Sequence, residues 1–177
     1  MNIRSFDGVS PVLGARVYVD PQATVIGRVV LGEDASVWPM AVVRGDVNSI
    51  AVGARTNVQD GGVLHVTHDG PYSPGGLALV VGEDVTVGHK AILHACTIGN
   101  RCLIGMGSIV LDGAVVGDEV LIAAGSVVAP GKNLPARTLW VGNPARQARM
   151  LTEREVESLR YTAAHYVRVK DAYRAAR

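Results

Sequence analysis

The sequence predicts a mainly β solenoid in which short strands are joined by tight corners, followed by one C-terminal α-helix. Three observations indicate this class: aliphatic residues recur every six positions, 21 of the 177 residues are glycine while only one is phenylalanine, and Gly or Asp interrupts the apolar runs. A period of six excludes a sustained helix over about residues 11–131, and the glycines break the strict alternation that is typical of a flat sheet. Short strands linked by turns therefore account for this part of the chain.

The six-residue period continues through most of the chain. This pattern resembles the hexapeptide-repeat proteins, and the resemblance covers about residues 10–145. It implies a left-handed parallel β-helix, a solenoid in which three repeat units make one coil. The aliphatic positions of the repeat are Val19, Val25, Leu31, Val37, Val43, Val52, Val58, Leu64, Val81, Val87, Leu93, Ile98, Ile104, Val110, Val116, Ile122 and Val128.

One interruption of the repeat is much longer than the others. The repeat places Val43, Leu64 and Leu93 on the same face of three successive coils. After Leu64, the Gly- and Pro-rich stretch at residues 66–77 adds more residues than a corner needs, which predicts a loop that leaves the coil. We therefore expect a β-helix domain over residues 1–147 that carries a loop at 66–77.

The second region, residues 148–177, is predicted to be a helix. Thr152 and Glu155 have the spacing of a capping box, which marks a helix start. No Gly or Pro follows, and Val156, Leu159, Ala163, Tyr166, Val167 and Lys170 occur at helical intervals. We expect this helix to pack along the solenoid or on a neighbouring subunit.

Composition excludes several classes of protein. Hydrophobic residues make up 48% of the chain and charged residues 19%, which excludes intrinsic disorder. The 17 Lys and Arg balance 16 Asp and Glu, so charge gives no reason to expect nucleic acid or an anionic membrane as partner. No apolar run is long enough for a membrane span or a signal peptide, which predicts a cytoplasmic protein. The two cysteines, Cys96 and Cys102, are interpreted as reduced structural residues.

Three of the five histidines lie close to the predicted loop. His65 and His94 each follow the aliphatic residue of one face, so they are expected on adjacent coils, roughly 5 Å apart. Arg44 occupies the same place one coil earlier, whereas His89 lies on the preceding face and leaves the coil around the corner. One chain therefore does not bring the three imidazoles together easily. A neighbour in a closed ring would, and a three-sided solenoid suits a cyclic trimer.

Three imidazoles are a chemically meaningful set. Neutral imidazole is the usual protein ligand of Zn²⁺ and is compatible with Fe or Co. Three such ligands leave a coordination position open, which is the arrangement of a catalytic site. The sequence therefore predicts a catalytic metal site formed between subunits.

Several short motifs resemble the γ-class carbonic anhydrases, and the resemblance spans nearly the whole chain. The motifs are Arg44-Gly45-Asp46, Asn57-Val58-Gln59-Asp60-Gly61, Leu64-His65, Gly88-His89 and Leu93-His94. The resemblance implies hydration of CO₂ to bicarbonate by a metal-bound hydroxide at the interface of a homotrimer. It implies Zn as the cofactor, with Fe or Co as alternatives, and His65, His89 and His94 as its ligands.

The same resemblance implies roles for other residues. Arg44 and Asp60 would form an ion pair between subunits, and Asp46 would support the interface. Asn57 and Gln59 would orient the water and the substrate, and Tyr166 would lie near the metal, with Tyr161 and Tyr173 as competitors for that place. Purely structural roles for these residues stay open at this point: surface ion pairs, caps of solenoid turns, and packing.

The loop departs from the best-studied members of that family, which carry a glutamate there for proton transfer. Residues 66–77 contain no Glu, and His68 and Asp69 are the possible proton shuttle. Two other functions stay open: an acyltransferase that uses acyl-CoA, as many hexapeptide proteins are, and a metal-binding homologue without catalysis.

Overall fold

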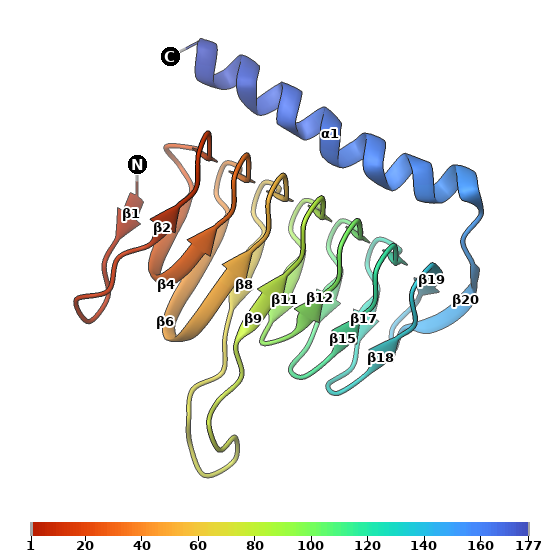
Figure 1. Ribbon diagram of the computed structural model, residues 1–177. Coiled ribbons are helices and arrows are strands. Elements are labelled where there is room, and N and C mark those ends of the chain that lie inside the picture. The colour runs from red at the N-terminus through yellow and green to blue at the C-terminus, as the bar shows by residue number, and fades with distance from the viewer. Residues whose placement is uncertain (1, 177) are drawn as a thin grey trace.

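In the computed structural model, which describes residues 2–176, short parallel strands wind into a three-sided solenoid and one helix lies along it (Figure 1). The predicted fold class, a left-handed parallel β-helix with a C-terminal α-helix, is confirmed. Positions 1 and 177, the outer limits of the two predicted regions, lie outside the described residues.

One face of the solenoid is a separate sheet that is covered by the helix. Its strands are β3 (Tyr18–Val19), β5 (Ser36–Val37), β7 (Asn57–Val58), β10 (Thr86–Val87), β13 (Leu103–Ile104), β16 (Leu121–Ile122), β19 (Thr138–Val141) and β20 (Arg146–Met150). The last strand, β20, pairs antiparallel to β19, whereas the other pairs are parallel. The predicted domain boundary after residue 147 therefore falls within β20.

The other two faces form one continuous sheet, because β4 (Thr24–Leu31) and β6 (Val42–Val52) continue around a corner from one face to the next. The first of these two, here called the histidine face, also contains β1 (Asn2–Arg4), β8 (Val63–His65), β11 (Ile92–His94), β14 (Ile109–Val110) and β17 (Val127–Val128). The third face contains β2 (Val12–Leu13), β9 (Leu79–Val81), β12 (Thr97–Ile98), β15 (Val115–Val116) and β18 (Asn133–Leu134).

The aliphatic residues of the six-residue period fill the inside of the coil. Val43, Leu64 and Leu93 pair in register on successive coils and are fully buried, as the repeat predicted. Residues 66–77 leave the coil between β8 and β9 and protrude from it (Figure 1). The backbones of Thr67 and Leu77 hydrogen-bond to each other at the base of this loop, at 3.0 Å in both directions.

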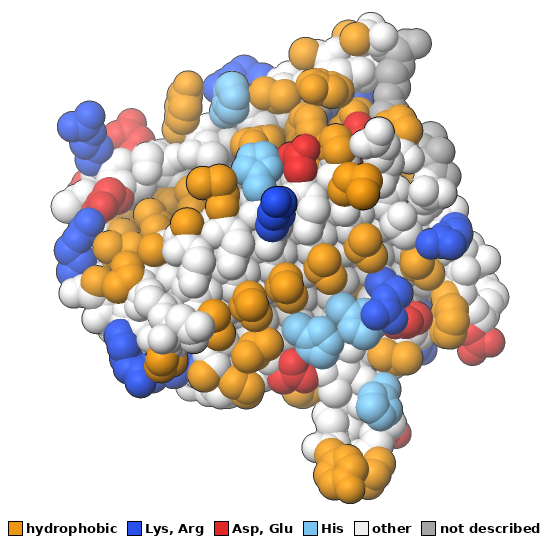
Figure 2. Space-filling view, turned by 180° about the vertical axis from the view of Figure 1, so that it is seen from behind, with side chains coloured by type: hydrophobic (Ala, Val, Ile, Leu, Met, Phe, Trp, Pro, Cys, Tyr) orange, Lys and Arg blue, Asp and Glu red, His pale blue; other side chains and the backbone are white. Residues whose placement is uncertain are grey.

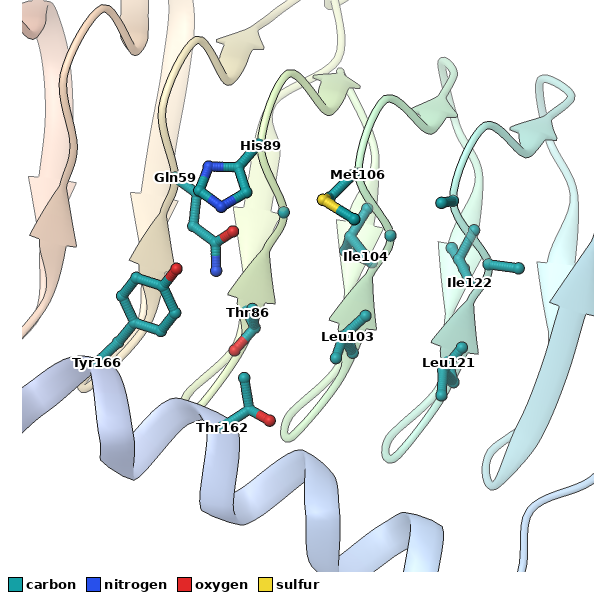
Figure 3. A pocket seen from close by; sticks show the side chains of 14 residues that line it. Gln59, Thr86, His89, Leu103, Ile104, Met106, Leu121, Ile122, Thr162 and Tyr166 are labelled. Carbon is teal, nitrogen blue, oxygen red and sulfur yellow. The ribbon is translucent and has the colours of Figure 1, made fainter.

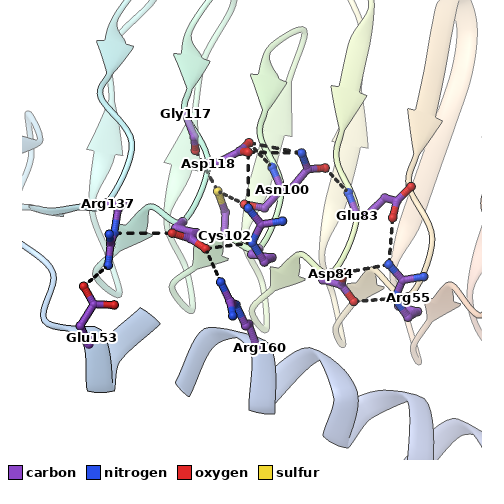
Figure 4. A network of polar contacts seen from close by, with 12 residues as sticks. Arg55, Glu83, Asp84, Asn100, Cys102, Gly117, Asp118, Arg137, Glu153 and Arg160 are labelled. Carbon is purple, nitrogen blue, oxygen red and sulfur yellow. Dashed lines mark hydrogen bonds and ion pairs between the residues drawn. The ribbon is translucent and has the colours of Figure 1, made fainter. Parts of the chain in front are cut away.

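The corner between the third face and the helix-covered face carries charges that alternate in sign from coil to coil. We call these residues the charge ladder; they are Arg16, then Glu33 and Asp34, then Arg55, then Glu83 and Asp84, then Arg101, then Asp118 and Glu119, then Arg137. Part of the ladder is shown in Figure 4. The coils stack closely here, since a Cβ on Gly53 would lie 2.5 Å from the backbone carbonyl carbon of Gly82. Glycine is therefore required beside the charged residues.

The helix α1 (Glu153–Ala175) begins at the predicted capping box, in which Thr152 and Glu155 bond to each other's backbone N–H. Its buried side chains are Val156, Leu159, Ala163 and Lys170. Three ion pairs attach it to the charge ladder: Glu153 to Arg137 at 2.5 Å, Arg160 to Glu119 at 2.9 Å, and Lys170 to Asp34 at 2.7 Å. The helix is therefore fixed to the solenoid at both ends and in the middle.

The two cysteines are buried free thiols. Cys96 is 2% exposed and Cys102 is 1% exposed, and burial raises the pKa of each to about 12. Their interpretation as reduced structural residues agrees with this environment. No helix within residues 2–176 has the length and apolar character needed to cross a membrane. The cytoplasmic location stays a prediction.

Candidate metal centre

His65 and His94 form a pair on the histidine face. They end the adjacent strands β8 and β11 and are register partners, and their ring centroids lie 5.1 Å apart. This is the placement that the repeat predicted. His65 Nδ1 faces His94 Nε2 at 3.1 Å, so one nitrogen of each ring points at the other ring.

The second nitrogen of each ring lies against a carboxylate. His65 Nε2 is 3.0 Å from Asp46 Oδ1, and His94 Nδ1 is 2.6 Å from Asp112 Oδ1. Arg44 donates to the other oxygen of Asp46, and the hydroxyl of Thr67 donates to the other oxygen of Asp112. Each histidine is therefore oriented by a carboxylate that is itself held by another side chain.

The shifted pKa values of His65, Asp46 and Asp112 favour binding of a cation at this pair. Burial lowers the pKa of His65, although Asp46 opposes that effect, so a lone pair is available at neutral pH. Burial alone would raise the pKa of Asp46, but hydrogen bonds from Arg44 and His65 outweigh it and lower that pKa to about 2. Burial likewise acts to raise the pKa of Asp112, and the bonds from Thr67 and His94 bring it below its usual value. Both carboxylates are therefore anions at neutral pH.

His89 lies around the corner from this pair. It follows β10 and its Nδ1 is 2.9 Å from Asp60 Oδ2, with the histidine 43% exposed. Within residues 2–176, no three His, Cys, Asp or Glu side chains come together in a way that could hold a metal ion. Among the described residues, His89 is therefore separate from the pair of His65 and His94.

His89 shares a pocket of about 360 Å³ with Gln59 and Tyr166 (Figure 3). In this pocket the Tyr166 hydroxyl points toward Gln59 and His89. Burial, and secondly the charge of Asp60, raises the pKa of Tyr166, so its phenol stays protonated and can donate a hydrogen bond. Of the three candidate tyrosines in the described helix, Tyr166 lines this pocket, whereas Tyr161 stacks on His165 and Tyr173 packs on Trp38 without being part of the lining.

Asn57 lies behind Gln59 rather than at the pocket surface. It is fully buried and donates to the hydroxyl of Thr86 at 3.1 Å and to the carbonyl of Val85 at 3.3 Å. Its own side-chain oxygen accepts from Gln59 Nε2 at 3.1 Å. Asn57 therefore fixes the amide orientation of Gln59.

The remaining predicted residues have partners within the chain. Arg44 pairs with Asp46, and Asp60 pairs with His89, so the predicted ion pair between Arg44 and Asp60 across subunits stays a prediction. His68 and Asp69 are exposed on the loop, where Asp69 accepts from the backbone N–H of Gly75 at 2.7 Å.

Sequence reasoning missed Thr67 and Asp112. For Asp112 the strand register contained the necessary information. Leu93 pairs with Val110, so Leu111 lies beside His94 and Asp112 follows at the corner. Extending the register one coil beyond His94 would therefore have placed this acidic residue next to it. The hydroxyl of Thr67 had no such signal, since it depends on how the loop leaves the coil.

An apolar row runs along the histidine face beside the histidine pair (Figure 2). The row consists of outward side chains that pair in register on successive coils and are only partly buried: Val42, Val63, Ile92, Ile109 and Val127. The row leaves partly exposed apolar surface next to the histidine pair.

The repeat and the parallel coils define this chain as a hexapeptide-repeat protein. A family model described as bacterial transferase hexapeptide (six repeats) matches residues 95–130. Protein YrdA of Escherichia coli (strain K12) is 54% identical over 171 residues, which cover 97% of this chain and 93% of that protein. Gamma carbonic anhydrase 1, mitochondrial, of Arabidopsis thaliana is 38% identical over 169 residues, which cover 94% of this chain and 60% of that protein. The crystal structure of a hexapeptide transferase family protein from Anaplasma phagocytophilum is 41% identical, with a TM-score of 0.89 and 97% of each chain covered.

Within the hexapeptide-repeat proteins, the chain belongs to the γ-carbonic-anhydrase-like family. The resemblance seen in the sequence motifs is thus confirmed at the level of the family. Relatives that carry the name carbonic anhydrase indicate an enzyme family and imply a metal cofactor.

Proposed function

We propose that the protein is a metal-dependent enzyme that hydrates CO₂ to bicarbonate at the interface between subunits of a homotrimer. The observation that carries this proposal is the pair of ring nitrogens, His65 Nδ1 and His94 Nε2, that face each other at 3.1 Å. With the opposite nitrogens against carboxylates, these two are the lone pairs that a cation would meet.

The distance between these nitrogens fits a shared metal ion. Zn–N bonds are about 2.0–2.1 Å long, so two imidazole nitrogens on a tetrahedral zinc lie about 3.3 Å apart. The 3.1 Å spacing in this chain is close to that value. Zn²⁺ is therefore the cofactor we propose, and Fe²⁺ and Co²⁺ accept the same imidazole ligands.

The third ligand would be His89 of a neighbouring subunit. His89 is half-exposed at the corner of its own chain, and a neighbour docked on the histidine face would bring it toward His65 and His94. Such a neighbour would also cover the apolar row beside the pair, which includes Val63 and Ile92. Both features support a closed ring of three subunits.

A divalent cation held by these imidazoles would lower the pKa of a bound water to about 7 and so would supply hydroxide at neutral pH. The chain's own contribution is to orient the reactants. Asn57 holds the Gln59 amide, whose remaining N–H is available to donate to an oxygen of CO₂ as negative charge develops on it. The Tyr166 hydroxyl offers a second donor in the same pocket. His68 and Asp69 on the exposed loop are the proposed route for the released proton.

The test is stopped-flow CO₂ hydration with protein purified anaerobically and loaded in parallel with Zn²⁺, Fe²⁺ or Co²⁺. We expect His89→Ala to remain trimeric in sedimentation analysis but to lose metal and activity. His165→Ala is the matched control for metal retention and assembly, because His165 is exposed on α1 and stacks on Tyr161; since its ring also contacts Tyr166, the rate of this variant is not used as the control. Full metal retention by His89→Ala would refute the ligand shared between subunits. Metal binding with no rate above buffer would instead favour a non-catalytic homologue, and tight coenzyme A binding would favour an acyltransferase.

A further inference from the structure

Asp112 connects one of the proposed metal ligands to the protruding loop. Its Oδ1 lies 2.6 Å from His94 Nδ1, and its Oδ2 accepts a hydrogen bond from the hydroxyl of Thr67. Asp112 comes from the corner after β14, one coil beyond His94, whereas Thr67 lies at the base of the loop. Three separate parts of the chain therefore meet at this carboxylate.

The contact with Asp112 determines which nitrogen of His94 carries the proton. A neutral imidazole has one N–H, and a carboxylate can only accept, so the proton lies on Nδ1 beside Asp112. This leaves the lone pair of His94 on Nε2, the nitrogen that faces His65 at 3.1 Å. Carboxylates that accept from a metal-binding histidine fix its tautomer and ring orientation and raise its basicity.

Thr67 in turn orients Asp112. A hydroxyl has a single proton, and Thr67 donates it to Oδ2, which leaves Oδ1 directed at His94. The backbone of Thr67 is held at the loop base by its two bonds with Leu77 and by Asn48 Nδ2, which donates to its carbonyl at 3.2 Å. The position of the loop base therefore sets the position of the carboxylate.

We infer that Asp112, held in place by Thr67, is a positioning residue that fixes the metal-binding tautomer of His94 and couples the loop base to the affinity of the site for metal. This inference rests on the proposed function, since it assumes that His94 Nε2 binds the cation. It assigns to the loop a structural link to the metal site that is independent of proton transfer by His68 or Asp69.

The experiment measures Zn²⁺ and Co²⁺ affinity of the assembled full-length protein by competition with a chelator, together with the visible absorption spectrum of the Co²⁺ form. We expect Asp112→Ala to weaken metal binding about 10- to 100-fold, the usual effect of losing such a partner, and to alter the Co²⁺ spectrum. Asp112→Asn keeps the shape of the side chain and an acceptor oxygen but loses the charge. We expect its metal affinity to lie between the affinities of the wild type and Asp112→Ala. We expect Thr67→Val to weaken binding about two- to tenfold, the factor of one ordinary hydrogen bond.

A double-mutant cycle separates this role from a general structural one. Because Thr67 acts through Asp112, Thr67→Val should have no further effect in the Asp112→Ala background. Asp7→Asn and Thr97→Val are matched controls at exposed positions and should leave affinity and spectrum unchanged. Equal effects of Thr67→Val in both backgrounds, or wild-type affinity and spectrum in Asp112→Ala, would overturn the inference while leaving the metal site intact. Absence of metal binding by the wild type would overturn the proposed function itself.

Discussion

The ion pair between Lys170 and Asp34 offers a direct test of how α1 is attached to the solenoid. Lys170 is fully buried, and its ammonium group lies 2.7 Å from Asp34 and 2.5 Å from Asp171. Asp34 belongs to the charge ladder and also accepts from Arg16 at 2.7 Å. Truncating Lys170 to Ala removes a buried cation from this cluster and leaves the space of its aliphatic stem unfilled.

The size of the effect follows from what remains after the substitution. Losing one partner of a buried ion pair costs about 3–5 kcal/mol when the other charge is left alone. Asp34 keeps its bond to Arg16, so we expect Lys170→Ala to lie at the low end, with a loss of about 3 kcal/mol in the free energy of unfolding. Lys170→Met fills most of the same space but leaves the same carboxylates without their cation, so we expect it to recover only the packing part of the loss and to stay destabilised by roughly 2–3 kcal/mol.

Urea unfolding of the assembled protein at fixed concentration measures these differences. The fluorescence of Trp38 reports on the docked helix, because the centroid of its ring lies 5.5 Å from that of Tyr166 and 5.3 Å from that of Tyr173, both on α1. Helical circular dichroism gives a second signal for the same transition. If Lys170→Ala unfolded within about 0.5 kcal/mol of the wild type, the reasoning from burial would be refuted.

The same cluster predicts an acid-dependent loss of stability. The Arg16 hydrogen bond, opposed by burial and aided by Lys170, lowers the pKa of Asp34 to about 2. A lowered carboxyl pKa contributes stability that is fully present above the unfolded value, near pH 4, and is lost as the pH falls toward 2. We expect the unfolding midpoint to drop across this window, and to drop less in Asp34→Asn. An identical drop in both proteins would contradict this assignment.

Three further predictions concern the core, the thiols and the loop. Leu31→Ala, at a fully buried position, should lower the free energy of unfolding by about 2–5 kcal/mol in the same urea assay. With pKa values of about 12, Cys96 and Cys102 should not react with a thiol reagent at pH 8 until the protein unfolds; rapid labelling of the native protein would contradict their burial. If His68 and Asp69 transfer protons, their joint replacement by Ala should slow CO₂ hydration in weak buffer and be rescued by strong buffer. Equal rates in both buffers would exclude them.

The register of the histidine face could be predicted from the sequence because parallel coils leave little freedom. Once Leu64 and Leu93 are assigned to the same inward position, the residues that follow them must lie side by side, and the structure pairs His65 with His94. The capping box at Thr152 was equally local, since its hydrogen bonds span three residues.

Side-chain partners at the corners could not be predicted in this way. Asp60 pairs with His89, and Arg44 pairs with Asp46. These pairings depend on the side-chain rotamers at the corners of the coil. The hydrogen bond from Thr67 to Asp112 joins residues 45 positions apart and depends on the path of the loop. A six-residue period determines which backbone positions are neighbours, and it does not determine side-chain rotamers or loop paths.

The charge ladder restricts how an architecture of this kind can change in length. Arg55 lies between acidic residues at the corners of the two adjacent coils. Deletion of the coil that carries Glu83 and Asp84 would place Arg55 next to Arg101. Like charges would then meet where opposite charges now pair. Duplication of one coil would create the same clash, whereas gain or loss of two coils together preserves the order of signs. Evolutionary growth of this solenoid by internal duplication is therefore expected to proceed by even numbers of coils.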